Sequence, residues 1–318
     1  MAKYRFDQVA RECRTTFKGD KNGMPIVGLE HLVPNEMLVR DFEVDTENTF
    51  TKSFKQGQIL FGRRRAYQQK AGVAQFDGIC SGDITVIEAI PGKIEPNLLP
   101  FIVQNEQFFE HAIQGSAGSL SPRVKWEHLA SYEIELPTME KQRVLADKLW
   151  TAYRLKESYK KLLAATDEMV KSQFIEMFGN CQQVEKLSSL CDTFIDGDWI
   201  ESKDQSDEGI RLVQTGNVGN GFFKGKEDKC RFISDETFDR LHCTEIFSGD
   251  ILVSRLPDPI GRACMIPNGL GRMITAVDCC IIRLKESILA DFFIAYTMTP
   301  NYSAQINEVT TGTTRRRV

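Results

Sequence analysis

Short apolar runs and longer amphipathic stretches follow one another along this chain of 318 residues. The short runs are rich in β-branched residues and bounded by Gly, Asp or Pro, which predicts β-strands at 59–63, 86–90, 250–254 and 279–284. Longer mixed stretches follow them, and we expect helices within 97–113 and 288–306. Each half of the chain is therefore predicted to be an α+β globule.

A different pattern occupies the middle of the chain. Residues 138–178 contain neither Pro nor Gly and are rich in good helix formers, with Pro137 before them and Gly179 and Asn180 after them. Apolar residues recur there at steps of three and four, so we expect one helix about 60 Å long with an apolar stripe. Such a stripe is expected to pair with another long helix. Two consecutive shorter helices are the alternative.

The two halves repeat each other in sequence. FKQGQILFGR at 54–63 matches FSGDILVSR at 247–255, with an offset of 192 between equivalent residues. GMPIVGL from Gly23 parallels GIRLVQTGN from Gly209, and GSLSPRV at 118–124 matches GTTRRRV at 312–318. Because the blocks occur in the same order with nearly constant spacing, we infer an internal duplication. The predicted domains are 1–137 and 181–318, joined by a coiled-coil-type helix at 138–180.

Composition narrows the class of protein. With 42% hydrophobic residues the chain can form buried cores, and no run is long enough to span a bilayer, so we expect a cytoplasmic protein. The nine cysteines include no C-x-x-C pair, and we expect reduced thiols. The net charge of −4 gives no global attraction to nucleic acid. Any contact with DNA or RNA must therefore come from local clusters.

Basic clusters occupy matching places in the two halves. GRRRAYQQK at 62–70 follows a predicted strand and combines cations with an aromatic residue, and SRLPDPIGR at 254–262 is its counterpart. The segments GSLSPR and GTTRRR combine glycine, hydroxyl groups and arginine, a set that suits phosphate contacts. Arginine can also bind guanine in the major groove. Solvated surface loops are the alternative for any single cluster.

Catalytic motifs are missing or weak. The four histidines lie far apart without an i, i+4 pair, and no phosphate-binding loop of the Walker type occurs. A two-metal nuclease needs clustered carboxylates, and the nearest approach is DGDWIESK, which contains Asp196, Asp198, Glu201 and Lys203. We expect no catalytic residue and no bound metal. A stand-alone metal-dependent endonuclease and a helix-mediated scaffold without a DNA role stay as alternatives.

The combination of features resembles a known family. ELPTMEKQRVLADKL at 135–149 leads into the long helix, KSQFIEMFGN at 171–180 ends it, and the repeated blocks flank it. In this the chain resembles the specificity subunit of type I restriction-modification systems, over almost its whole length. The helix entry and the helix end are the most specific parts of the resemblance.

The resemblance implies a non-catalytic, sequence-specific DNA-binding subunit in which each globule is a target recognition domain for one half of a bipartite, asymmetric site. It also implies adenine methyltransferase and restriction subunits as partners, which would carry S-adenosylmethionine, ATP and Mg²⁺. The residues we expect to face DNA in the first half are Arg63, Arg64, Arg65, Tyr67, Lys70, Ser119, Ser121 and Arg123. Those in the second half are Arg255, Arg262, Arg272, Thr313, Thr314, Arg315, Arg316 and Arg317.

The helix is expected to bind partners through residues spaced along its apolar stripe: Leu145, Leu149, Tyr159, Leu162, Met169, Phe174 and Met177. Members of this family commonly carry a second such helix, packed antiparallel to the first, and the sequence here ends at the equivalent point. Three explanations stay open: a shortened or recombined gene product, an engineered fragment, or self-association with a second copy through the long helix. The DNA sequence that is read cannot be deduced from residue types.

Overall fold

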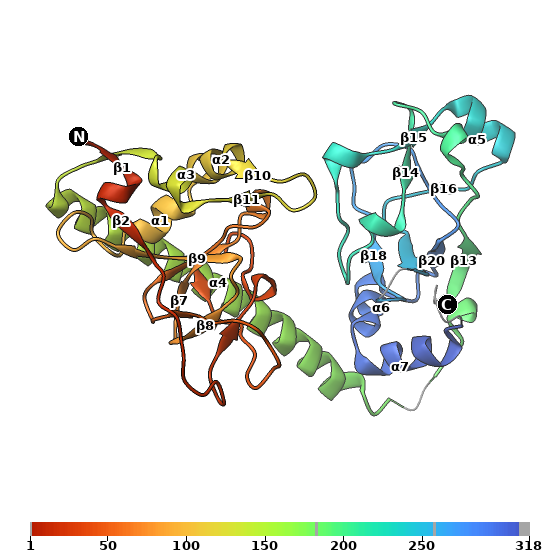
Figure 1. Ribbon diagram of the computed structural model, residues 1–318. Helices are drawn as coiled ribbons and strands as arrows, with labels where there is room; N and C mark the ends of the chain where they lie inside the picture. Colours follow the sequence, from red (N-terminus) through yellow and green to blue (C-terminus); the bar gives the residue numbers. More distant parts are fainter. Residues whose placement is uncertain (1, 182–183, 257–258, 312–318) are drawn as a thin grey trace. The chain divides into compact units, whose positions relative to one another are not determined.

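The computed structural model describes residues 2–181, 184–256 and 259–311. The chain forms two compact units, Met1–Lys160 (unit 1) and Lys161–Val318 (unit 2) (Figure 1). The long helix belongs to both, because it crosses from one unit into the other at Lys160; the division into 1–137, 138–180 and 181–318 stays a prediction. Over these described ranges, no helix combines the length and the apolar character needed to cross a bilayer.

Unit 1 is built on two main sheets. The larger has the order β2-β9-β6-β7-β4, and its strands are β2 (Ala10–Cys13), β9 (Ile84–Ala89), β6 (Ile59–Gly62), β7 (Ala71–Ala74) and β4 (Leu38–Val39). The smaller has the order β3-β8-β5, with β3 (Ile26–Val27), β8 (Gly78–Cys80) and β5 (Lys52–Phe54). Two short ladders pair β1 (Ala2–Arg5) with β12 (Glu133–Leu136) and β10 (Ser116–Ala117) with β11 (Arg123–Val124). The helices are α1 (Leu99–Val103), α2 (Glu106–Gln114) and α3 (Trp126–Ala130).

The position of the central strand β6 explains why residues 59–61 are all apolar. Successive side chains of a strand point to opposite faces. Ile59 and Phe61 join the core that contains the aromatic residues of α2, whereas Leu60 joins a second core on the other face. Phe61 stacks on Phe109 with ring centroids 5.5 Å apart. Both faces are covered, so the run is apolar at every position instead of alternating.

Unit 2 repeats the arrangement. One sheet has the order β13-β20-β17-β18, formed by β13 (Cys191–Asp196), β20 (Cys279–Leu284), β17 (Ile251–Ser254) and β18 (Ala263–Met265). The other has the order β15-β14-β19-β16, formed by β15 (Phe232–Ile233), β14 (Ile210–Val213), β19 (Met273–Thr275) and β16 (Glu245–Ile246). Its helices are α5 (Asp235–Leu241), α6 (Ala290–Thr297) and α7 (Pro300–Val309).

The duplication extends to the pairing of single residues between neighbouring strands. Ile59 faces Ile87 across β6 and β9, and Ile251 faces Ile282 across β17 and β20. The parallel pair β3–β8 likewise matches the parallel pair β14–β19. The expected fold class, two repeated α+β units with a long helix, is confirmed.

The long helix α4 (Met139–Phe178) is continuous over 40 residues, so the alternative of two shorter helices is wrong. Its first turns pack on unit 1 through the buried side chains of Gln142, Ala146 and Tyr153. Gln142 is tied at both ends: its Nε2 donates to the carbonyl of Pro137 (2.9 Å), and its Oε1 accepts from the N–H of Glu95 (2.9 Å). These bonds fix the start of the helix against unit 1.

Candidate nucleic-acid interface

Two basic segments far apart in the sequence meet in unit 1. Arg63, Arg64 and Arg65 follow β6, and the hairpin β10–β11 lies against them. The N–H of Val124 donates to the carbonyl of Arg63 (2.9 Å), and the N–H of Arg65 donates to the carbonyl of Pro122 (2.8 Å). The Arg64 guanidinium donates to the hydroxyl of Ser121 (3.0 Å). The predicted clusters at 63–65 and 118–123 thus form one site, which we call the arginine cluster: Arg63, Arg64, Arg65, Ser121 and Arg123.

A single carboxylate organises this cluster. Arg123 donates to Asp83 through Nε (2.7 Å) and Nη2 (3.3 Å), and Arg64 Nη1 lies 3.5 Å from the same carboxylate. The bond from Arg123 lowers the pKa of Asp83, and the charges of the neighbouring arginines act in the same direction. The cluster contains four arginines, of which Arg64 and Arg123 bind Asp83, so the site keeps a local positive surplus. Asp83 was not predicted from the sequence. The available signal was its position directly before β9, which aligns with the position of Asp278 directly before β20.

Local backbone geometry presents the cluster. Arg65 adopts a left-handed conformation (φ +54°), which residues with a Cβ rarely use, and Gln69 does so too (φ +51°). The resulting tight turn leaves Tyr67 exposed. Ser119 lies exposed in the hairpin loop. The Nε atoms of all three arginines of the turn are buried and have no hydrogen-bond partner among the described residues.

A cavity of about 790 Å³ adjoins the cluster. Arg63 and Asp83 belong to its wall. The other charged residues that line it are Glu12, Arg14, Lys52, Lys125 and Glu127. Four cations and three carboxylates line the cavity, so its wall has a mixed character and the positive surplus lies at the arginine cluster.

Lys70 and Arg262 occupy equivalent positions in the two units and donate equivalent hydrogen bonds. Lys70 Nζ donates to the carbonyl of Leu29 (2.7 Å), and Arg262 Nη2 donates to the carbonyl of Thr215 (3.4 Å), the residue that corresponds to Leu29 in the repeat. Arg262 also donates to the carbonyls of Pro259 and Val218. In both units the cation therefore binds the backbone of its own unit.

Carboxylates bind two of the predicted cations of unit 2. Arg255 pairs with Asp196 (2.6 Å). Arg272 lies over the ring of Phe238 and pairs with Asp235 (2.6 Å) and, at 3.3 Å, with Glu245. Arg255 and Arg272 thus bind different carboxylates, whereas Arg64 and Arg123 of unit 1 bind the same one, Asp83. The remaining predicted residues lie outside the described ranges: Thr313, Thr314, Arg315, Arg316 and Arg317.

The comparison with known families decides the assignment. Residues 9–165, which hold the arginine cluster and the first turns of α4, match the family described as Type I restriction modification DNA specificity domain. This segment, about half of the chain, belongs to that family.

Relatives of the type I specificity family agree with that assignment. The Type I restriction enzyme EcoDI specificity subunit of Escherichia coli is 23% identical over 186 residues, which are 55% of this chain and 40% of that protein. A chain from a solved type I R-M system matches 100% of this chain and 82% of its own length, with a TM-score of 0.53 and 17% identity. The type I restriction-modification S subunit from M. genitalium matches 96% of this chain and 78% of its own length, with a TM-score of 0.55 and 12% identity. At these identities the solved structures show a shared fold.

The acidic loop considered for a nuclease has structural contacts of its own. Asp196 pairs with Arg255, and Glu201 pairs with Lys203 (2.7 Å). Asp198 accepts the N–H of Thr244 (2.8 Å), and burial raises the pKa of its carboxyl. Among the described residues, no group of three or more His, Cys, Asp or Glu side chains could hold a metal ion.

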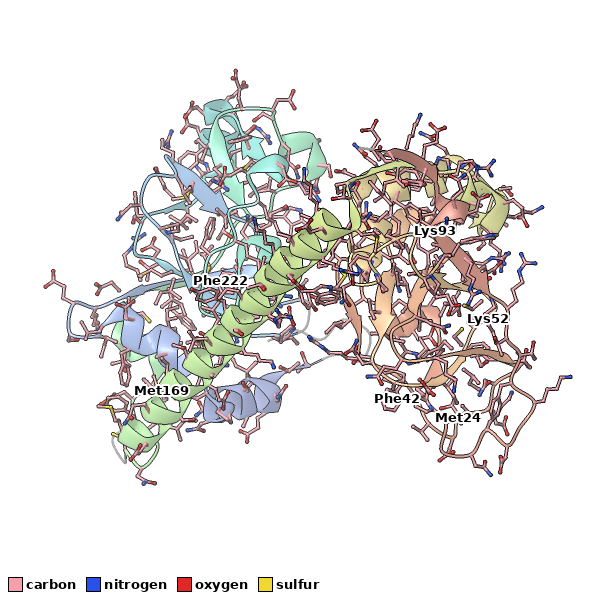
Figure 2. The ribbon with its side chains drawn as sticks, turned by 90° about the vertical axis from the view of Figure 1, so that its left-hand side faces the viewer. Met24, Phe42, Lys52, Lys93, Met169 and Phe222 are labelled. Carbon is pink, nitrogen blue, oxygen red and sulfur yellow. The ribbon has the colours of Figure 1, made fainter. Side chains whose placement is uncertain are left out.

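The long helix α4 keeps an apolar stripe exposed to solvent. Of the predicted partner-binding residues, Leu149 is half-buried, and Phe174 packs on Phe292 of α6 with ring centroids 5.2 Å apart. The others are exposed: Leu145, Tyr159, Leu162, Met169 and Met177. Figure 2 shows the side chain of Met169 on the C-terminal half of the helix. The helix therefore still presents the predicted stripe.

Proposed function

We propose that this chain is the DNA-recognition subunit of a type I restriction-modification complex and reads a bipartite, asymmetric site with its two repeated units. Its role is recognition without catalysis. Family membership supports the class of function, and the arginine cluster supports the contact surface in unit 1. The observation that carries the proposal is the meeting of 63–65 with 118–123 around Asp83, because it concentrates cations at one place on an otherwise acidic chain.

The arginine cluster has the chemistry to bind DNA, which offers both phosphates and the edges of its bases. Guanidinium groups bind phosphate oxygens or guanine bidentately. Arg123 and Arg64 are already held at fixed places by Asp83, so less side-chain freedom is lost when they bind. Tyr67 and Ser119 flank them as exposed groups. We leave Lys70 and Arg262 out of this surface because the carbonyls of their own units occupy them.

The proposed partners are the adenine methyltransferase and restriction subunits of the complex, with the exposed stripe of α4 as the docking surface for the former. S-adenosylmethionine, ATP and Mg²⁺ belong to those partners in this proposal. This chain would determine which DNA site the complex binds, and the partner subunits would carry out the catalysis.

The first test is DNA binding as a function of salt. A reader of phosphates loses affinity as salt rises, with a slope of about 0.9 per phosphate contact. We expect Arg64→Ala to lower that slope by about one contact. The matched control is Lys93→Ala, an exposed cation of unit 1 away from the cluster in sequence (labelled in Figure 2). Binding that does not depend on salt, or equal slopes for the two variants, contradicts the proposal.

The second test is made in cells. Expressing the chain with its cognate methyltransferase subunit should create a new bipartite, asymmetric N6-methyladenine motif in the genome, which the methyltransferase alone does not create. A palindromic motif would mean that two chains pair and that one unit of each reads DNA. The absence of any new motif would count against the proposed partnership.

A further inference from the structure

The tip of the β10–β11 hairpin carries an apolar side chain in an unusual setting. Leu120 is 90% exposed, more than any other large hydrophobic side chain in the described part of the chain. It lies between the small side chains of Ser119 and Ser121, and Gly118 (φ +114°) makes the turn that leads to it. Figure 1 shows the loop between β10 and β11 reaching out from the body of unit 1. Leu120 therefore stands clear of its own unit.

Hydrogen bonds and an ion pair hold the base of this loop in place. The N–H of Arg65 donates to the carbonyl of Pro122 (2.8 Å), and Arg64 holds the hydroxyl of Ser121 (3.0 Å). Arg123, which opens β11, is pinned to Asp83. Three contacts thus fix the loop on the side that follows Leu120. The leucine is presented by a supported loop that does not fold back onto the core.

The surroundings indicate what the leucine meets. An isolated exposed leucine is ordinary on a protein surface. This one rises from a base of three arginines, with Ser, Gly and Pro as its loop neighbours, so it forms no apolar patch of the size that protein interfaces use. An apolar tip above a cationic base is complementary to duplex DNA, whose phosphates lie outside and whose stacked bases lie inside. Proteins that deform DNA insert Leu, Ile, Met, Phe or Pro between base steps in this way.

We propose that Leu120 is a wedge that enters a groove and partly unstacks one base step in the half-site that unit 1 reads, while the arginine cluster holds the flanking phosphates. This inference rests on the proposed function and adds a means of reading to it. The energy needed to unstack a step depends on its sequence, so the wedge would favour flexible pyrimidine–purine steps. Leu120 would thereby determine specificity without a hydrogen bond to a base.

The experiment uses the full chain and a duplex that it selects itself. The wild-type chain first enriches its preferred sequence from a random duplex pool, and 2-aminopurine is then placed at each position of that duplex in turn. We expect one position to brighten on binding, as unstacking requires. Leu120→Ala should abolish that signal and weaken binding about tenfold, the order expected from losing most of one buried leucine side chain. Leu120→Met should keep both, since methionine also serves as a wedge.

Controls separate the wedge from the phosphate contacts. Leu289→Ala removes an exposed leucine of unit 2 (75% exposed) and should leave binding and fluorescence unchanged. The salt slope of Leu120→Ala should equal that of the wild type, because no phosphate contact is lost. A lowered slope, equal affinity and fluorescence in Leu120→Ala, or a wild-type complex that brightens nowhere, would each overturn the wedge while leaving DNA recognition intact. Failure of the wild type to enrich any sequence would instead refute the proposed function.

Discussion

Replacing Asp250 by Asn should destabilise unit 2 by removing a buried charge. The Asp250 side chain is 4% exposed at the start of β17 and accepts two bonds from Arg283 of β20, at 2.7 Å from Nε and 2.6 Å from Nη2. It also accepts the N–H of Phe247 (2.8 Å). Asparagine has nearly the same shape and can still accept the Phe247 bond. The substitution therefore removes the charge and one guanidinium bond without opening a cavity.

The magnitude follows from these contacts. A hydrogen bond to a charged partner contributes about 1.5–3 kcal/mol, and breaking a buried ion pair costs about 3–5 kcal/mol. Arg283 is 37% exposed, so solvent screens part of the attraction and the lower end applies. We expect a loss of about 2 kcal/mol, which lowers Tm by about 4–8 °C in a unit of this size.

Urea unfolding, with hydrogen exchange followed on peptides from β17 and β20, measures the effect in unit 2. Glu286→Gln makes the same carboxyl-to-amide change at an exposed site of that unit and should be nearly neutral. A double-mutant cycle with Arg283→Met measures the interaction between Asp250 and Arg283, and we expect a coupling energy of about 1 kcal/mol or more. A coupling below about 0.5 kcal/mol would refute the reasoning.

Three further predictions concern stability and access. Because the pKa of Asp83 is lowered in the folded protein, its contribution to stability is complete above its ordinary pKa of 3.8 and is lost as pH falls through the lower folded value. Asp83→Asn should therefore make the urea midpoint depend less on pH between pH 5 and 3. Gly78→Ala should cost about 2 kcal/mol in urea unfolding, since its Cβ would lie 2.5 Å from a backbone carbonyl, whereas Gly82→Ala has open space and should be neutral. Iodoacetamide should label exposed Cys181 first and Cys80 only on unfolding, because burial raises the pKa of the Cys80 thiol to about 12; equal rates by mass spectrometry would contradict this.

Most of the fold could be predicted because its signals are local or repeated. The apolar run of β6 and its copy in β17 are visible in the sequence, and α4 spans the stretch without Pro or Gly. The meeting of 63–65 with 118–123 could not be deduced, because it depends on where a hairpin lies against a strand end some sixty residues earlier. The role of Asp83 was hidden for the same reason.

Residue type alone does not show which groups a cation contacts. Lys70 and Arg262 were predicted to face DNA, and in the structure each donates to a backbone carbonyl at the same place in its own unit. A carbonyl left without a donor inside a fold is costly, so a long cation beside it is captured. Sequence shows the charge of such a residue but not the acceptor that holds it.

The two repeats keep one backbone plan and exchange the polar groups upon it. Gln58 and Glu88 of unit 1 occupy the positions of Asp250 and Arg283 in unit 2: Gln58 donates to Glu88 (2.6 Å) and accepts the N–H of Lys55 (2.8 Å), as Asp250 accepts that of Phe247. The two positions pair in both units while the direction of the hydrogen bond between them is reversed: Gln58 donates to Glu88, but Asp250 accepts from Arg283. This is possible because strand register is set by the apolar positions and leaves the polar partners free to vary. If each unit reads DNA, the same freedom applies at the arginine cluster and its counterpart. Two units with equal backbones and different polar groups would then read different half-sites, which is what an asymmetric target requires.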